Sequence, residues 1–320
     1  MSVAEIIDRI SKDLAIPASE VTASIRMAAH RCRIVKIPKR NGGYRLAVQP
    51  PASVKPFLSW IRHEVLDKLP VSPVASAFRS GASTLSNACI HRHSRYSVRI
   101  DVANFFPSIQ GADLRQTIVQ NASRVPDWSL KPENIDIIIQ ACFDSRGVLP
   151  IGYSTSPIIA NSVMYELDSR LIALISDSEI YGVAKISRYA DDFVFSTDKR
   201  GACAVFSEAL GKELSKSENP KLKINASKTR FMSRDGGSTL ITGLRVTSEG
   251  SIKVHADYKD HVRLLLRLYK QKRLNPEEIP ALVGHLSYIQ HVDAKLFTKL
   301  SFKYDLEISQ LRQSDGSPDS

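Results

Sequence analysis

The chain has 320 residues, of which 43% are hydrophobic and 24% are charged, a composition that supports a substantial core and excludes an intrinsically disordered protein. Lysine and arginine outnumber aspartate and glutamate by 44 to 33, and the resulting charge of +11 favours a polyanionic partner such as nucleic acid. No stretch reaches the roughly 18 apolar residues of a membrane span, and the first residues lack the apolar core of a signal peptide, so we expect a cytoplasmic protein without a membrane partner.

The first predicted elements are two short helices, a hairpin and a third helix. Residues 3–31 carry apolar side chains at helical spacing, interrupted at Pro17. Residues 33–50 alternate apolar and polar side chains around Asn41-Gly42-Gly43, the composition of a tight hairpin turn. Residues 53–69 are apolar along one helical face, and a stretch rich in glycine, serine and alanine then runs to Asn87.

The remaining elements alternate between strands and helices. A strand is predicted from Tyr96 to Phe106, and a mostly helical region from Ser108 to Phe143. The later segments are predicted as a helix at 156–176, a hairpin at 183–198, a helix at 201–216, strands at 221–233 and 239–254, and a helical segment at 255–304. This order is typical of an α+β fold with an antiparallel sheet. The polar end of the chain predicts a disordered tail at 313–320.

Cysteine spacing argues against a zinc site and a disulfide framework. The cysteines are scattered, without a CxxC pair, at Cys32, Cys89, Cys142 and Cys203. We expect reduced thiols, as in other cytoplasmic proteins.

Basic residues concentrate in two segments that are poor in acids. Between residues 26 and 100 the only acids are Glu64 and Asp67. A second run, residues 261–273, contains no acid and combines leucines at helical spacing with a cationic face that includes Arg263, Arg267 and Lys270. Two such surfaces favour a groove that binds nucleic acid, although each run alone is also compatible with a solvated cationic face.

Adjacent carboxylates lie where the hairpin at 183–198 is predicted to bend. The sequence Tyr189-Ala190-Asp191-Asp192 stands between two arms of alternating apolar residues, so Asp191 and Asp192 would both lie at the tip. Two carboxylates this close repel each other unless a divalent cation compensates their charge. By itself, an Asp-Asp pair in a turn more often stabilises the turn through side-chain hydrogen bonds to the backbone than takes part in catalysis.

A third acid favours the metal interpretation. Asp101 ends an apolar strand, and an acidic side chain is rare at such a position unless it has a partner. Three convergent carboxylates, from Asp101, Asp191 and Asp192, suit two Mg²⁺ ions, which activate a primer hydroxyl and bracket the in-line displacement of pyrophosphate. The predicted chemistry is nucleotidyl transfer.

From residue 34 to about 254, the order of motifs resembles that of reverse transcriptases. IDVANFF at 100–106 resembles the first acidic motif of the palm, and LPIGYSTSPIIAN at 149–161 resembles the LPxGxxxSP motif under the incoming nucleotide. YADD at 189–192 resembles the catalytic hairpin, NASKT at 225–229 the next, lysine-bearing motif, and LITGLRV at 240–246 the primer-grip region. The resemblance implies an RNA-directed DNA polymerase that uses dNTPs and Mg²⁺.

The same resemblance implies a right-hand architecture of fingers, palm and helical thumb. The N-terminal helices and fingers would be residues 1–95 and 110–148, the palm 96–109 and 149–250, and the RNA-binding thumb 251–312. Within the palm, Asp101 and Asp191 would bridge both metal ions, with Asp192 in a weaker role and the backbone carbonyl of Val102 as a further ligand.

The resemblance also implies residues for nucleotide binding. Phe106 falls where the family places a ring against the sugar C2′, which would exclude a ribose 2′-hydroxyl; core packing is the alternative for Phe106 and for Phe105. Arg45, and with it Lys36 or Lys39, resembles the fingers residues that grip the triphosphate.

Three further positions concern the nucleotide site. Lys228 would donate a proton to pyrophosphate, or would simply be exposed. Gly152 would permit close backbone approach. The family's usual glutamine is replaced here by Ile151, which removes a polar contact.

Two short motifs resemble the retron branch of the family. NACIH at 87–91 resembles the NAxxH signature, and ITG at 241–243 resembles the VTG element. The residues predicted to bind RNA are Asn87, His91, Thr242, Gly243, Arg263, Arg267 and Lys270. An ordinary buried histidine and a bulge glycine are the alternatives for His91 and Gly243, and for His285, Tyr288 and His291 a mixed core face is favoured over stacking on bases.

A retron enzyme implies particular partners. These are a structured noncoding RNA that is both template and primer, started at a guanosine 2′-hydroxyl, and its branched RNA–DNA product, msDNA. Host RNase H would trim the hybrid, and an effector protein encoded in the same locus would act in anti-phage defence. The alternatives are a reverse transcriptase of another bacterial class, an RNA polymerase, a cyclase-type palm, and a non-polymerising RNA-binding scaffold or antitoxin. Of these, an RNA polymerase would have a polar residue at the position that Phe106 occupies.

Overall fold

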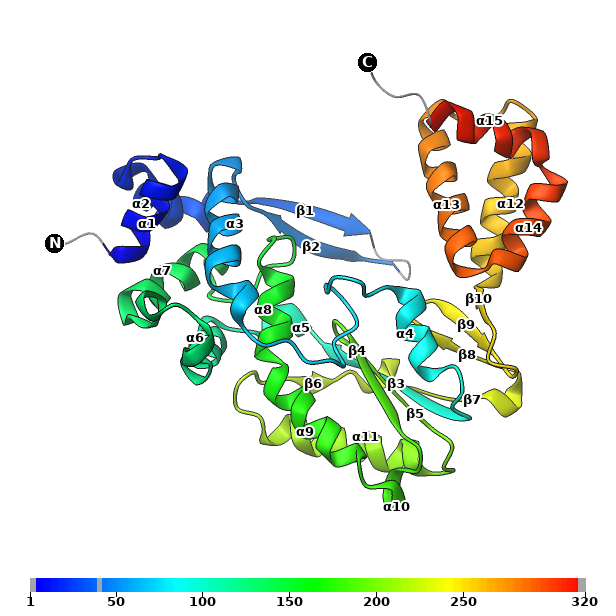
Figure 1. Ribbon diagram of the computed structural model, residues 1–320, viewed down its shortest axis with the longest axis horizontal. Helices are drawn as coiled ribbons and strands as arrows, with labels where there is room; N and C mark the ends of the chain where they lie inside the picture. The colour runs from blue at the N-terminus through cyan, green and yellow to red at the C-terminus, as the bar shows by residue number, and fades with distance from the viewer. Residues whose placement is uncertain (1–3, 39–41, 316–320) are drawn as a thin grey trace.

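The computed structural model describes residues 4–38 and 42–315. Figure 1 shows a helical N-terminal part, a central sheet with its helices, and a separate C-terminal helical bundle. Lys39, Asn41 and the tail from residue 316 lie outside the described residues, and the predictions for them stay predictions.

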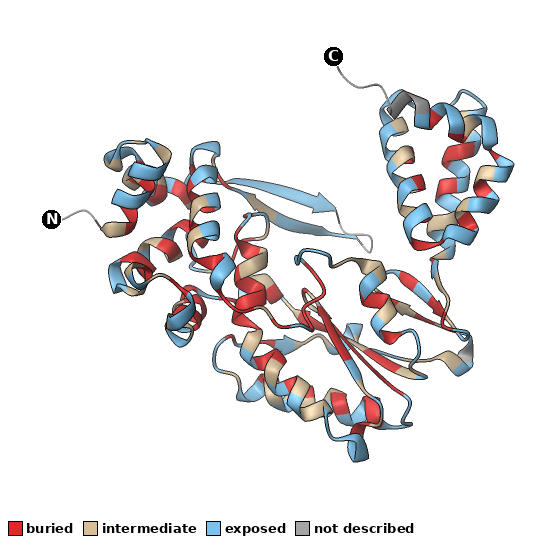
Figure 2. Cartoon of the chain, in the orientation of Figure 1, coloured by how far each residue is buried: buried red, intermediate tan, exposed pale blue. Residues whose placement is uncertain are grey.

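The N-terminal part begins with two helices that separate at Pro17, as the sequence predicted. Its elements are α1 (Glu5–Leu14), α2 (Ala18–Ala28), β1 (Arg33–Pro38), β2 (Tyr44–Gln49) and α3 (Lys55–Glu64). Strands β1 and β2 form the predicted antiparallel hairpin, with Pro38 opposite Tyr44. Figure 2 shows that this hairpin is largely exposed, so its side chains are available to a partner.

The central sheet is antiparallel, in the order β4-β5-β3-β6, and β7 also pairs with β3. Its strands are β3 (Tyr96–Ala103), β4 (Lys185–Tyr189), β5 (Asp192–Thr197), β6 (Lys223–Ile224) and β7 (Arg230–Ser233). Strand β3 has neighbours on both edges, and Val98, Ile100 and Val102 are buried along it. The predicted α+β class with an antiparallel sheet is confirmed.

Helices cover both faces of this sheet. On one face Phe195 stacks on Phe206 of α11 (Ala202–Lys216), with ring centroids 4.3 Å apart. On the other face the neighbouring residue, Ser196, contacts His91 of α4 (Thr84–His91). Successive residues of a strand point to opposite faces, so α4 and α11 enclose the sheet between them (Figure 1).

The other helices of this region differ slightly from the predicted segments. They are α5 (Phe105–Ser108), α6 (Gly111–Gln120), α7 (Pro132–Cys142), α8 (Ser156–Val163), α9 (Tyr165–Ile175) and α10 (Ser178–Tyr181). The single helix predicted at 156–176 is two helices, separated at Met164. The glycine- and serine-rich stretch that runs to Asn87 ends in α4, which begins after the Ser83 cap.

The C-terminal part has its own sheet and its own core. The sheet, in the order β10-β9-β8, consists of β8 (Ser238–Ile241), β9 (Leu244–Thr247) and β10 (Ile252–Val254). The bundle consists of α12 (Ala256–Lys270), α13 (Ile279–Val292), α14 (Ala294–Lys303) and α15 (Asp305–Asp315). Sheet and bundle share one hydrophobic cluster, which Ala88 of α4 and Val194 of β5 connect to the central sheet.

Three simpler predictions can be compared with the structure. Helix α15 extends to Asp315, so residues 313–315 of the predicted tail are helical, and the disorder expected for the rest of the tail stays a prediction. Cys32, Cys89, Cys142 and Cys203 are free thiols. Over the described residues, no helix is both long enough and apolar enough to cross a membrane.

Candidate active site

Three aspartates meet at one end of the central sheet. Asp101 of β3 lies directly opposite Asp192, the first residue of β5, and Asp191 occupies the turn between β4 and β5. The buried residues of β3 and β5 fix the register, because a slip by one residue would turn the apolar side chains of a strand to the wrong face. The same packing that forms the core therefore aligns the acids.

Backbone hydrogen bonds hold the tip of this hairpin against β3. The N–H of Val102 donates to the carbonyl of Asp191 at 2.9 Å, and the N–H of Asn225 donates to the carbonyl of Asp101 at 2.8 Å. Ala190 adopts a left-handed conformation with φ 56°, which is unfavourable for a residue with a Cβ. The surrounding contacts must therefore maintain the turn.

Burial and mutual repulsion raise the pKa of two of the acids. Burial raises the pKa of Asp191, and the charge of Asp101 adds to this effect. Burial also raises the pKa of Asp192 to about 6, against the opposing effect of Arg99. Repelling carboxylates of this kind are the arrangement that a bound cation stabilises.

Two basic side chains lie beside the aspartates. Lys228 Nζ is 3.1 Å from both carboxylate oxygens of Asp101. Arg99 Nε is 3.4 Å from Asp192 Oδ1, but neither atom makes a hydrogen bond, and both are buried. A buried oxygen without a donor is unfavourable, and a metal cation would satisfy it.

The donor set has the chemistry that Mg²⁺ requires. It consists of carboxylate oxygens, together with the backbone carbonyl of Val102, and oxygen is the ligand atom that Mg²⁺ prefers. Within the part of the chain that the structure describes, no three His, Cys, Asp or Glu side chains are already grouped to hold a metal ion.

Comparison with known proteins agrees with this geometry. Residues 37–275 match the family model described as reverse transcriptase (RNA-dependent DNA polymerase). The chain belongs to this family. Retron Ec73 reverse transcriptase of Escherichia coli is 36% identical over 86% of this chain and 88% of that protein. Retron Ec83 reverse transcriptase of E. coli is 27% identical over 91% of this chain and 92% of that protein. The retron-type resemblance is thus confirmed, as is the prediction of an RNA-directed DNA polymerase.

A solved structure shares the fold of the reverse transcriptase. Apo telomerase from Candida tropicalis superposes with a TM-score of 0.52 at 12% identity, over 89% of this chain and 60% of that chain. The reverse transcriptase thus spans about 60% of the telomerase length. At this identity the likeness concerns the fold alone, and it confirms the predicted right-hand architecture.

The two phenylalanines after the first aspartate lie in different surroundings. Phe105 is 3% exposed and belongs to the main core. Phe106 is only partly buried, and its ring makes edge contacts with Phe105 and with the exposed Phe78, at centroid distances of 5.4 and 6.3 Å. The core alternative thus applies fully to Phe105, whereas Phe106 packs against the same core but stays partly exposed in the reverse transcriptase.

Arg45 and Lys36 lie on opposite faces of the β1–β2 hairpin. Arg45 pairs with Ile37, and Lys36 pairs with Leu46, so alternation turns the two cations away from each other. Arg45 acts electrostatically on Asp191, lowering its pKa. Lys36 instead places Nζ over the Tyr44 ring, 6.0 Å from its centroid. The two side chains therefore project from opposite faces of the hairpin, and of the two it is Arg45 whose charge acts on Asp191.

Gly152 makes its close approach to the protein's own strand β2. Its φ is +117°, and an added Cβ would lie 2.7 Å from the carbonyl oxygen of Val48. Beside it, the carbonyl of Ile151 accepts a hydrogen bond from Val48 N at 2.6 Å. Ile151 and Gly152 thus connect the β1–β2 hairpin to the loop before α8 through their backbones.

Asn87 and His91 are buried, which corrects the prediction that they contact RNA. Asn87 donates to Thr242 Oγ1 at 3.4 Å. The two ring nitrogens of His91 lie 2.7 Å from Ser196 Oγ and 2.8 Å from Ser187 Oγ, between strands β4 and β5. Burial lowers the pKa of His91 to about 3, so the ring is neutral. Its alternative interpretation, an ordinary buried histidine, is correct.

Thr242 and Gly243 form the turn between β8 and β9. Both have positive φ, 46° and 81°, and they connect the paired residues Ile241 and Leu244, as in a two-residue type I′ turn. Gly243 is exposed and is a turn residue, not a bulge. Thr242 donates to the carbonyl of Thr84 at 3.2 Å. The two short retron motifs therefore contact each other.

The cationic side chains of α12 are exposed, as expected for one face of an amphipathic helix. Arg263 pairs with Asp260 at 3.2 Å, and Lys270 pairs with Glu307 at 3.0 Å. Arg267 lies on the same face between them and is exposed. The prediction that these residues bind RNA stays a prediction.

The aromatic and histidine side chains of α13 mostly contact the protein. His285 Nδ1 lies 2.8 Å from the Tyr258 hydroxyl, and the Tyr288 hydroxyl lies 3.4 Å from Thr84 Oγ1. His291 is exposed. These contacts favour the mixed core face for His285 and Tyr288.

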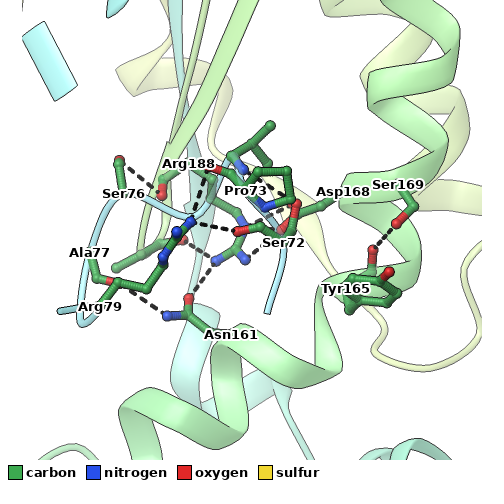
Figure 3. Close-up of polar contacts among 12 residues, drawn as sticks. Ser72, Pro73, Ser76, Ala77, Arg79, Asn161, Tyr165, Asp168, Ser169 and Arg188 are labelled. Carbon is green, nitrogen blue, oxygen red and sulfur yellow. Dashed lines mark hydrogen bonds and ion pairs between the residues drawn. The ribbon is translucent and has the colours of Figure 1, made fainter. Parts of the chain in front are cut away.

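A buried ion pair that the sequence did not predict lies behind the β4–β5 hairpin. Arg188 and Asp168 are both fully buried and make a two-pronged contact (Figure 3). One signal was available: Arg188 immediately precedes YADD, in a strand whose neighbours are buried. Asp168 gave none, because it lies on a different element.

Proposed function

We propose that this reverse transcriptase is the polymerase of a retron. It copies a structured noncoding RNA, starts from the 2′-hydroxyl of a guanosine in the same RNA, and leaves a branched RNA–DNA hybrid. The observation that best supports a polymerase active site is the strand register, which places Asp101 opposite Asp192, with Asp191 at the adjoining tip of the hairpin. The support for a retron is the 36% identity with Retron Ec73 reverse transcriptase.

In this proposal Asp101, Asp191, Asp192 and the carbonyl of Val102 hold two Mg²⁺ ions. When bound, the ions supply charge that activates the primer hydroxyl and stabilises the departing pyrophosphate. The remaining residues bind and orient the nucleotide. Phe106 excludes a 2′-hydroxyl, Arg45 binds the triphosphate, and Lys228 moves from Asp101 to protonate the leaving group.

The proposed partners follow from the same assignment. Residues 1–95 and 110–148 serve as fingers, 96–109 and 149–250 as palm, and 251–312 as a thumb that holds the RNA through α12. The reaction takes place in the cytoplasm, where RNase H trims the hybrid and an effector protein from the same locus completes an anti-phage system. The substrates of the reaction are dNTPs, and its product is msDNA.

The test is expression of the chain with its flanking upstream DNA in bacteria. We expect a short, abundant DNA species that resists RNase, has a 5′ end sensitive to debranching enzyme, and is absent for an Asp191→Ala, Asp192→Ala variant. An unbranched product would assign the chain to another class of reverse transcriptase. The absence of product, combined with full RNA binding by the purified protein, would support the scaffold alternative.

A further inference from the structure

The catalytic hairpin contains a buried cation that the proposed chemistry does not use. Arg188 lies in β4, two residues before Ala190 at the tip, and its side chain is 0% exposed. Removing a guanidinium from water is strongly unfavourable unless its partners compensate for the lost hydration. The burial of a charged side chain so close to Asp191 therefore indicates a specific role for Arg188.

The guanidinium of Arg188 connects two helices to the hairpin tip (Figure 3). Nε and Nη2 donate to the two carboxylate oxygens of Asp168 on α9, at 2.9 and 2.7 Å. Nη1 donates to Asn161 Oδ1 on α8 at 3.2 Å and to the carbonyl of Ala190 at 3.4 Å. The planar fork of arginine suits this arrangement, because it offers several donors in fixed directions.

The main chain of Arg188 is fixed as well. Its N–H donates to the carbonyl of Val74 at 2.7 Å, and its carbonyl accepts from Ser76 N at 2.8 Å. Residues 72–79, which we call the strap, thus run alongside β4. The Asn161 amide also donates to the carbonyl of Ala77 at 3.0 Å, so the residue that contacts the guanidinium holds the strap too (Figure 3).

These contacts act on the orientation of Asp191. The carbonyl of Ala190 and the N–H of Asp191 belong to one planar peptide unit, so a bond to that carbonyl restricts the rotation of the whole unit. On the other side, Val102 N donates to the carbonyl of Asp191. Asp191 is therefore held through the peptide units on both sides, which fix the direction of its Cα–Cβ bond and so the position from which its carboxylate extends.

We propose that Arg188 is a positioning residue, which fixes the tip of the hairpin so that the Asp191 carboxylate points at the reacting phosphate. The inference rests on the catalytic role proposed for Asp191. A purely stabilising ion pair would behave differently, because any replacement that restores stability would then restore activity.

Paired substitutions separate the two roles. Arg188→Met alone leaves Asp168 buried without its partner and is expected to destabilise the fold. Arg188→Met combined with Asp168→Leu removes both charges, and an apolar pair of this kind often restores stability. The Ala190 carbonyl remains without its donor. Arg188→Lys is the second variant, since lysine keeps the charge but lacks the fork.

A matched control is available on α9, the helix that contains Asp168. Arg170 of α9 makes an exposed ion pair with Glu213 at 2.9 Å, away from the hairpin. Arg170→Met therefore repeats the change of side chain without the contact to the tip.

The full-length proteins are compared by thermal unfolding, by extension of an oligo(dT) primer on poly(rA), and by Mn²⁺ binding measured with electron paramagnetic resonance. In the double variant and in Arg188→Lys we expect kcat to fall about 10- to 100-fold, because small misplacements of reacting groups have effects of that size. Mn²⁺ affinity should fall as well, while KM for dTTP stays within about twofold of wild type. Arg170→Met should leave all of these quantities unchanged.

A folded double variant with the kcat and Mn²⁺ affinity of wild type would overturn the proposal and leave Arg188 a stabilising residue only. Failure of the proposed catalytic site looks different. An Asp191→Asn protein that still extends the primer would show that Asp191 is not catalytic, whatever the Arg188 variants do.

Discussion

Phe105 and Phe106 are adjacent in the chain, yet only Phe105 is fully packed into the core. The short helix α5 turns the two rings in different directions, and the interplanar angle between them is 78°. At the scale of single residues, the exposure of a side chain thus separates a functional role from a role in core packing. The distinction leads to opposite expectations for substitution.

Phe106→Ala should relax sugar selection. Removing the ring opens space for a 2′-hydroxyl, and we expect discrimination between dTTP and UTP to fall roughly tenfold or more, with a modest loss of stability. Single-nucleotide incorporation on an RNA template measures kcat/KM for both nucleotides. Phe105→Ala is the control: it should reduce the free energy of unfolding by about 3–5 kcal/mol and leave sugar selection unchanged. Unaltered UTP incorporation by Phe106→Ala would contradict the gate.

His91 should make stability depend on pH. Burial lowers its folded-state pKa from 6.5 to about 3, so between these values the unfolded chain binds the extra proton. The free energy of unfolding should therefore fall as pH decreases below 6.5, by about 1.4 kcal/mol per pH unit from this residue. Urea unfolding between pH 7.5 and 5 measures this slope.

His91→Gln should remove that component and show a flatter profile than wild type, although it is less stable at pH 7.5. His63 is exposed on α3, and His63→Gln should keep the wild-type profile. Equal slopes for wild type and His91→Gln would show that the ring is already protonated in the fold.

At the scale of elements, the β1–β2 hairpin is attached to the loop before α8 by backbone contacts. Strand β2 approaches the 149–155 loop so closely that position 152 has no room for a side chain. A sequence motif that suggested contact with a nucleotide thus serves in part to hold two elements together.

Gly152→Ala should destabilise the protein more than Gly147→Ala does. Both glycines have positive φ, but an added Cβ meets Val48 only at position 152 and has open space at position 147. We expect a loss of about 1 kcal/mol for Gly147→Ala, from backbone strain, and an additional 1–3 kcal/mol or so for Gly152→Ala, from steric overlap. Guanidinium unfolding gives both values, and equal losses would argue against the contact with β2.

Local patterns predicted the elements well, and contacts between distant elements were harder to predict. Alternation and the YADD motif placed Asp191 and Asp192 at a tip because both signals lie within one hairpin. The burial of His91 was given only as an alternative, since its partners Ser187 and Ser196 are distant in sequence. Arg188 was missed for the same reason.

At the scale of the whole molecule, charge is distributed unevenly. Between residues 26 and 100 the basic residues far outnumber the two acids, Glu64 and Asp67, and residues 261–273 contain no acid at all. Long-range attraction of this kind increases association with a polyanion and weakens as salt is added.

Arg267→Gln should weaken RNA binding for every sequence to a similar degree. If Arg267 contacts one phosphate, the slope of log affinity against log salt should decrease by about one. Fluorescence anisotropy with a labelled structured RNA, from 50 to 300 mM salt, measures this slope. Arg170→Gln, which replaces an arginine paired with Glu213, should keep the wild-type slope. A wild-type slope for Arg267→Gln would remove α12 from the proposed RNA surface.

The contact between α4 and the β8–β9 turn bears on how such enzymes can be recombined. One short helix meets the central sheet through His91 and the C-terminal part through Asn87 and Thr242. A chimera that takes residues from 238 onward from one relative and α4 from another would pair two contact surfaces that did not evolve together. Transplanting the C-terminal part intact should therefore require α4 to be exchanged with it.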